Sequence, residues 1–271
     1  MSHKPDTFVG GNAHRYILLV LTCVSVCGDS VAIARESMSG REDGFSGLNS
    51  GYNGATTDWP RFIECWKAAF HDGDQARISV LDNGPGVNEV DFAQVEKILG
   101  LSFPASYRDF ISYFKPRPLV ERLAPWGDVL IGVYEPAQVA RLSEFDPEYI
   151  DILERFPIDS PDDEYYRYGI AQDDSSGRTA ELKDALVVGK YGDARSELIL
   201  LHPGRVTLDG EMEASILYNS GEFRAPTFAE IMRQLSYLEV GNHSDQMPPF
   251  HQTALVGTCA DLVKIDDVWW E

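Results

Sequence analysis

Basic residues are scarce in this chain. Its 271 residues include 23 Lys and Arg against 43 Asp and Glu, a formal net charge of −20 at pH 7. Nucleic acids and anionic membranes are bound mainly through Lys and Arg, so this balance argues against both as partners. The same charge attracts a basic protein and speeds its approach. The alternative is that the acidity only keeps the protein soluble.

Cysteine is also sparse, at four residues. Cys23 and Cys27 lie inside an apolar run, whereas Cys65 and Cys259 stand alone. Neither a Cys-x-x-Cys pair nor a Cys/His spacing indicates zinc. We expect Cys65 and Cys259 to be two separate structural thiols. The alternative is a disulfide between them, which requires an exported protein.

A hydrophobic run long enough to span a bilayer well is missing. The N-terminal run Tyr16–Cys27 is too short for that purpose. Lys4 and Arg15 precede it, and the small-x-small sequence Ala32-Ile33-Ala34 follows, which together form a signal-peptide pattern. Gly28-Asp29-Ser30 interrupts the segment and argues against export. We therefore expect a cytoplasmic protein, with export and cleavage near Ala34 as the alternative.

Familiar catalytic motifs are missing too. The sequence contains no Gly-x-Ser-x-Gly, His-Glu-x-x-His, Walker A or Gly-x-Gly-x-x-Gly motif. Asp128 and the pair Asp173-Asp174 offer carboxylates for acid/base chemistry, but such residues occur by chance in a chain this acidic. The prediction is a protein that is not an enzyme, with no catalytic residue, cofactor or metal.

What is present divides into four parts. Residues 1–57 hold the apolar segment and a linker rich in Gly, Ser and Asn, and residues 58–87 hold an accessory helix and a loop. Residues 88–240 form the main module, and residues 241–271 a C-terminal extension. Asp58 caps the accessory helix. The apolar stripe of that helix consists of Phe62, Ile63, Trp66 and Phe70.

Two helices open the module. The first ends at Gly100, where a helix C-terminus favours glycine, and Pro104 suits the first turn of the second. The apolar face of the first helix is Phe92, Val95, Ile98 and Leu99. That of the second helix is Tyr107, Phe110, Ile111 and Phe114. A last helix begins with a capping box from Thr227 to Glu230.

Strands fill the middle of the module. Asp209-Gly210 is a hairpin turn signal, and the strand after it alternates apolar residues with Glu211, Glu213 and Ser215. Pro136–Arg155 is predicted as helix, split near Pro147. The remaining predicted strands are Trp126–Val133, Tyr165–Gln172, Ala185–Val188 and Glu197–His202. The order predicts a single α+β domain, with an antiparallel sheet flanked by helices.

The predicted core combines residues from all these elements. Its members are Leu99, Phe103, Tyr107, Phe110, Phe114, Leu198, Leu200, Ile216, Phe228 and Ile231.

Three segments of the module carry a resemblance to a known family. The first is Gly100-Leu101-Ser102-Phe103-Pro104-Ala105-Ser106-Tyr107-Arg108-Asp109-Phe110-Ile111. The second joins Val188-Gly189-Lys190-Tyr191-Gly192-Asp193 to Glu197-Leu198-Ile199-Leu200-Leu201. The third joins Asp209-Gly210-Glu211-Met212-Glu213-Ala214 to Phe228-Ala229-Glu230-Ile231-Met232. In their order and spacing, these segments resemble the SUKH superfamily, the Smi/Knr-type domain, over roughly residues 88–240.

The resemblance has departures and implications. Met212 replaces the usual Trp, and Lys115-Pro116-Arg117-Pro118 replaces the Gly-Gly or Asn-Gly expected after the second helix. The family implies a non-enzymatic binding domain. Bacterial members are typically immunity proteins that bind and block a toxin, often a nuclease, and fungal members are regulators. The implied partner is a basic toxin domain.

Acidic residues concentrate in the segment 144–164, which contains nine of them among 21 positions. The functional interpretation is a surface that meets the basic cleft of a nuclease, with neighbouring tyrosines as anchors. The alternatives are a solvated surface and tyrosines that pack on the sheet. The predicted contact residues are Glu144, Asp146, Glu148, Asp151, Asp162, Asp163, Glu164, Tyr165 and Tyr166.

Two classes of function therefore remain. The first is an intracellular immunity protein that acts by tight stoichiometric binding. The second is an exported or regulatory interaction protein, or a secreted enzyme of unknown type.

Overall fold

A computed structural model describes residues 55, 58–69, 76–78, 89–114, 118–124, 127–168, 172–192, 197–218 and 221–241. The chain divides into two compact units, residues 1–34 and 35–271, and all described residues belong to the second. The predicted signal peptide, the C-terminal extension and Cys259 lie outside the described residues.

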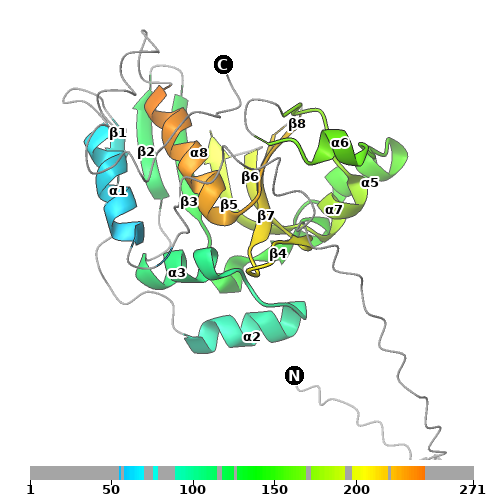
Figure 1. Cartoon of the computed structure of the whole chain (residues 1–271), viewed down its shortest axis with the longest axis horizontal. Helices are drawn as coiled ribbons and strands as arrows, with labels where there is room; N and C mark the ends of the chain where they lie inside the picture. Colours follow the sequence, from blue (N-terminus) through cyan, green and yellow to red (C-terminus); the bar gives the residue numbers. More distant parts are fainter. Residues whose placement is uncertain are drawn as a thin grey trace, which may run out of the picture. The chain divides into compact units, whose positions relative to one another are not determined.

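One antiparallel sheet organises this unit, as Figure 1 shows. Its main path runs β1 (Ala76–Ile78), β2 (Pro118–Ala124), β3 (Gly127–Val133), β5 (Leu186–Gly192), β6 (Glu197–Val206), β7 (Met212–Tyr218) and β8 (Gly221–Ala225). The two-residue strand β4 (Ala140–Arg141) pairs with β5 beside β3. Every pairing is antiparallel. The predicted α+β fold with an antiparallel sheet is confirmed.

One face of the sheet carries the larger hydrophobic core, called the first core here, and four helices contribute to it. They are α1 (Asp58–Ala69), α2 (Glu89–Leu99), α3 (Ala105–Tyr113) and α8 (Phe228–Gly241). The ring of Phe228 lies 5.4 Å from that of Tyr107 and 5.8 Å from that of Phe110. Trp59 of α1 completes this aromatic cluster, 4.8 Å from Phe110. Edge-on ring contacts of this kind add stability beyond the buried area.

The second face carries a smaller core. It is covered by α4 (Leu142–Phe145), α5 (Pro147–Arg155), α6 (Asp162–Tyr165) and α7 (Thr179–Asp184). Side chains of a strand alternate between faces, so Val187 packs here whereas Leu186 and Val188 join the first core. Figure 1 shows α5, α6 and α7 grouped beside β7 and β8. The central strands β5, β6 and β7 are thus buried on both sides.

The predicted core is largely confirmed. Phe103, Tyr107, Phe110, Phe114, Leu200, Ile216, Phe228 and Ile231 are buried, and Leu99 and Leu198 are half-buried against the cores. Ile98 was predicted on the apolar face of the first helix, but 75% of its surface is exposed. The helix packs on the first core through a narrow stripe of Phe92, Val95 and Leu99, and Ile98 lies on the flank that faces water.

Several turns behave as predicted. Gly100 and Gly210 have φ angles of 71° and 90°, the left-handed conformation that glycine adopts without steric cost. Thr227 caps α8, since its hydroxyl oxygen accepts from the Glu230 amide. The carboxylate of Glu230 binds the side chains of Arg233 and Gln234.

Two predicted elements need correction. In the predicted strand Tyr165–Gln172, the described residues are not strand, because Tyr165 ends the short helix α6 and Tyr166–Tyr168 follow it as a turn and loop. Asp162, Asp163 and Glu164 follow Pro161, and acidic residues favour the first turn of a helix. The segment Pro136–Arg155 does split at Pro147, but it begins with a 3₁₀ turn, Pro136–Gln138, and with β4 rather than with an α-helix.

Candidate functional site

The acidic segment forms a surface on α4 and α5. Asp146 starts α5, because its carboxylate accepts a 3.0 Å hydrogen bond from the Tyr149 amide and Pro147 occupies the first helical turn. Ile150 and Leu153 are buried in the second core. With those two positions turned inward, the other side of the helix faces solvent.

Exposed carboxylates and exposed apolar side chains lie near one another along α4, α5 and the C-cap of α5. Phe145, Ile152 and Phe156 are 42%, 50% and 74% exposed. They are three of the five large apolar side chains that the described part of the chain exposes. Single exposed apolar residues are ordinary, but a cluster of them marks a contact site. The α4–α5 surface is defined here as Glu144, Phe145, Glu148, Asp151, Ile152 and Phe156.

The carboxylates of this surface lack internal cations. Glu144, Glu148 and Asp151 are exposed, and none forms an ion pair with another described residue. Arg155 is the single basic residue of α5 and is also exposed. The surface therefore carries a local excess of negative charge around its apolar side chains.

Most of the other predicted acidic residues have a partner within the chain, but Glu164 of α6 is exposed and forms no ion pair with a described residue. Asp162 pairs with Arg178, and Asp163 lies 3.9 Å from Arg167. Glu154, which belongs to the same acidic segment, lies 2.6 Å from Lys183. The first two pairs partly neutralise α6, and the third neutralises one carboxylate of α5. Asp146 is half-buried and serves as a helix cap, so its charge is also engaged.

The predicted tyrosine anchors do not face outward together. Tyr165 is fully buried, and its hydroxyl donates to Glu213 Oε1 at 2.7 Å. Tyr168 donates to the other oxygen of the same carboxylate at 2.6 Å. Tyr166 is half-buried, with the Arg178 guanidinium 5.5 Å from its ring centre. Tyr165 therefore packs on the sheet and is not available to a partner, whereas Tyr166 is partly accessible.

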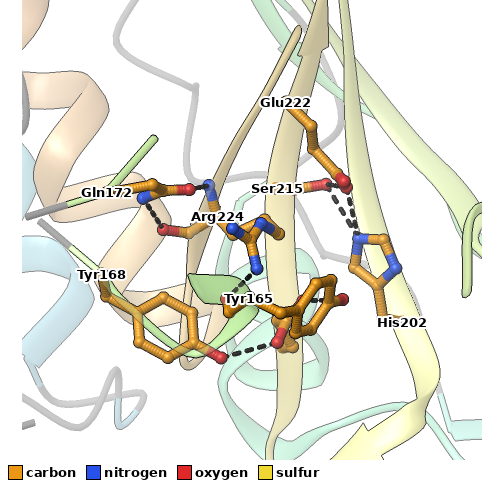
Figure 2. A network of polar contacts seen from close by, with 8 residues as sticks. Tyr165, Tyr168, Gln172, His202, Ser215, Glu222 and Arg224 are labelled. Carbon is orange, nitrogen blue, oxygen red and sulfur yellow. Dashed lines mark hydrogen bonds and ion pairs between the residues drawn. The ribbon is translucent and has the colours of Figure 1, made fainter. Parts of the chain in front are cut away.

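These tyrosines cover a polar network that the sequence did not reveal. Figure 2 shows His202, Ser215, Glu222 and Arg224 beneath Tyr165. Ser215 donates to Glu222 Oε1 at 2.7 Å, and the His202 Nε2 atom lies 2.8 Å from the Ser215 hydroxyl and 3.0 Å from Glu222 Oε1. All of these side chains are buried.

Arg224 ties the network to the segment after α6. Its guanidinium carbon lies 4.1 Å from the centre of the Tyr165 ring, and its Nη1 donates to the Tyr165 carbonyl. The Gln172 side chain accepts from the Arg224 amide at 2.6 Å and donates to the Arg224 carbonyl at 2.9 Å, as an added strand would. Figure 2 shows this pair beside Tyr168. The network therefore holds the α6 region against β8.

A serine, a histidine and a glutamate in contact invite comparison with a catalytic triad. In a triad the acid orients the histidine through the ring nitrogen that does not meet the serine. Here the serine and glutamate oxygens both contact Nε2, and Nδ1 meets no hydrogen-bond partner among the described residues. Because the three side chains are buried, a substrate has no access to them. These contacts fix the positions and charges of the three side chains but do not have the geometry of a catalytic triad.

The network shifts the pKa of its members in opposite directions. Burial of His202 opposes protonation, but the charge of Glu222 and its hydrogen bond outweigh burial and raise the His202 pKa. Burial likewise opposes ionisation of Glu222, but the His202 ring and Arg224 lower the Glu222 pKa. Both shifts favour the ion pair.

The described residues show neither a candidate metal site nor a helix that could span a membrane. Among the described residues, no group of three or more His, Cys, Asp or Glu side chains could hold a metal ion. None of the described helices is both long and apolar enough to cross a membrane. Cys65 is buried and disulfide-bonded, which differs from the expected free thiol, and the other three cysteines lie outside the description.

Two comparisons with known proteins found no match. No protein-family model matches the chain. No curated protein matches it either.

Proposed function

We propose that this chain is a non-enzymatic binding domain of the SUKH type, an immunity protein that neutralises a basic, nuclease-type toxin domain. The observation that carries the proposal is the α4–α5 surface, where unpaired carboxylates lie among exposed apolar side chains. Protein interfaces combine an apolar centre with a polar rim. The net charge of −20 favours a partner of opposite sign.

Positions that carry the family resemblance support the proposal. Gly100 ends α2 with a positive φ, Pro104 stands directly before α3, and the Asp209-Gly210 turn joins β6 to β7. Tyr107 and Phe110 are buried in the first core. These residue types are therefore needed where the family pattern has them.

Co-expression tests this function. The protein encoded by the neighbouring gene, if it is a large toxin, is produced with and without this chain in a sensitive host. We expect the host to survive production of the toxin only when this chain is also present. The two proteins should form a 1:1 complex, and this chain should turn over no substrate. Toxicity that persists despite a soluble, folded chain would reject the immunity function.

A second candidate is an exported interaction protein. The disulfide at Cys65 favours it, because disulfides persist mainly in oxidising compartments. The N-terminal signal-peptide pattern agrees with it. Intact mass and fractionation separate the two candidates. A cytoplasmic immunity protein retains residues 1–34 and a reduced Cys65, whereas an exported protein loses that segment and keeps the disulfide.

A further inference from the structure

We infer that the α4–α5 surface, and not the α6 region, is the contact site, and that its partner presents an apolar centre flanked by Lys and Arg. This inference rests on the proposed function and names the partner's chemistry at that same site. The acidic residues of segment 144–164 differ in whether they form ion pairs within the chain.

Internal ion pairs separate two groups of carboxylates. Those of Asp162, Asp163 and Glu154 already have cations within the chain. A partner that bound them would compete with those cations and gain little, because exposed ion pairs are weak. Glu144, Glu148 and Asp151 have no such competitor among the described residues. Asp159 and Glu164 are also exposed and form no ion pair with a described residue, so three of the five exposed, uncompensated carboxylates of the segment lie on α4 and α5.

The exposed apolar side chains lie at the same place. Glu148, Ile152 and Phe156 follow each other at intervals of four residues, so they project from one side of α5 and its C-cap. Phe145 ends α4, directly before the Asp146 cap. Near α6, by contrast, Tyr165 and Tyr168 are buried beneath the surface. The apolar contact energy is therefore available at α4 and α5.

Charge selects among possible occupants. A second copy of this chain would bring Glu148 and Asp151 against their own equivalents, and like charges across an interface oppose association. An anionic membrane is repelled in the same way. A basic protein surface with an apolar centre satisfies both components. Its Lys and Arg side chains would pair with the rim while its apolar groups cover Ile152 and Phe156.

A designed peptide tests this chemistry without the toxin. It has about 18 residues, or five helical turns, with Leu on one face and Lys on the flanks. A scrambled peptide of the same composition keeps the charge and loses the apolar face. Binding to the full chain is followed by fluorescence anisotropy at low and high salt. We expect saturable binding of the designed peptide only, weakened by salt.

Paired variants locate the site. Ile152→Ser/Phe156→Ser should weaken binding at least about tenfold, the effect of losing central contact residues. The control Ile98→Ser/Leu208→Ser removes two side chains that are 75% and 69% exposed elsewhere, and should change affinity less than about twofold. Glu148→Lys/Asp151→Lys should abolish the salt dependence, whereas Asp163→Lys/Glu164→Lys should retain most of it.

Several results would overturn the inference. They are no saturable binding of the designed peptide, equal binding of the scrambled peptide, equal losses in the test and control pairs, or self-association of the chain in light scattering. Toxin neutralisation distinguishes this failure from that of the proposed function. Full neutralisation by Ile152→Ser/Phe156→Ser would reject the contact site alone. Peptide binding without any neutralisation would reject the immunity function alone.

Discussion

His202 and Glu222 are enclosed together between the sheet and the α6 region. The His202 ring meets Ser215 and Glu222 directly, and the carboxylates of Glu213 and Glu181 also favour its protonated form. A buried ion pair of this kind does not guarantee stability, because removing water from two charges is costly. It does make stability depend on pH, since both pKa values shift on folding.

The direction of that dependence follows from the two shifts. A raised His202 pKa stabilises the fold below the ordinary value of 6.5, and this contribution is lost as pH rises through the folded pKa. A lowered Glu222 pKa stabilises the fold above 4.5 and fails as pH falls through the folded pKa. The pair therefore contributes fully between pH 4.5 and 6.5.

Replacement of His202 tests this dependence. In urea denaturation, the wild-type free energy of unfolding should fall as pH rises above 6.5, and His202→Gln should show a smaller fall. Equal pH dependence in both proteins would show that His202 does not bind the extra proton.

Tyr168 offers a second test at the residue scale. Tyr168→Phe removes the donor to Glu213 Oε2 and leaves part of a buried carboxylate without that bond. We expect a loss of about 1–3 kcal/mol in the free energy of unfolding. Tyr113→Phe is the control, because the half-buried Tyr113 hydroxyl makes no hydrogen bond to a described residue. Equal melting temperatures for the two variants would contradict this role of Tyr168.

At the scale of elements, local signals predicted caps and turns better than strands. Gly100, Gly210 and Thr227 mark helix or strand ends through their own side chains or dihedral angles, so short windows suffice. Asp58, predicted as a cap, lies in the first turn of α1. The strands β2 and β8 were missed. β8 is only five residues long, and its charged residues Glu222 and Arg224 are typical of an exposed loop in the sequence. In the fold both side chains are buried.

Gly189 has no room for a side chain because a neighbouring strand lies close to it, which the local sequence around Gly189 does not reveal. It lies in β5 at a shift in the pairing with β6, and a Cβ atom there would stand 2.5 Å from the Gly132 carbonyl oxygen. Gly189→Ala should lower the free energy of unfolding by about 1–3 kcal/mol, the usual range for overpacking. Gly132→Ala is the control, because a Cβ atom there meets no heavy atom within 4 Å. Thermal melting that ranks Gly132→Ala as the more damaging change would contradict the packing of β3 on β5.

At the scale of the whole molecule, charge and composition pointed to the segment that carries the candidate site but not to which of its residues are exposed and unpaired. The acidic excess of residues 144–164 is visible in the sequence. Which carboxylates are compensated depends on Arg178 and Lys183, which are brought to them by the fold. The orientation of Tyr165 likewise depends on Glu213, 48 residues away. Such long-range pairings cannot be read from spacing alone.

The central claim is that the α4–α5 surface binds a basic partner by charge steering and apolar contact. Stopped-flow association of the full chain with the neighbouring toxin, measured across ionic strength, tests it most directly. The association rate should fall as salt rises, since screening shortens the range of attraction. Glu148→Lys/Asp151→Lys should slow association and flatten the salt dependence without changing the melting temperature. An association rate that is independent of salt, or unchanged in that variant, would contradict the claim.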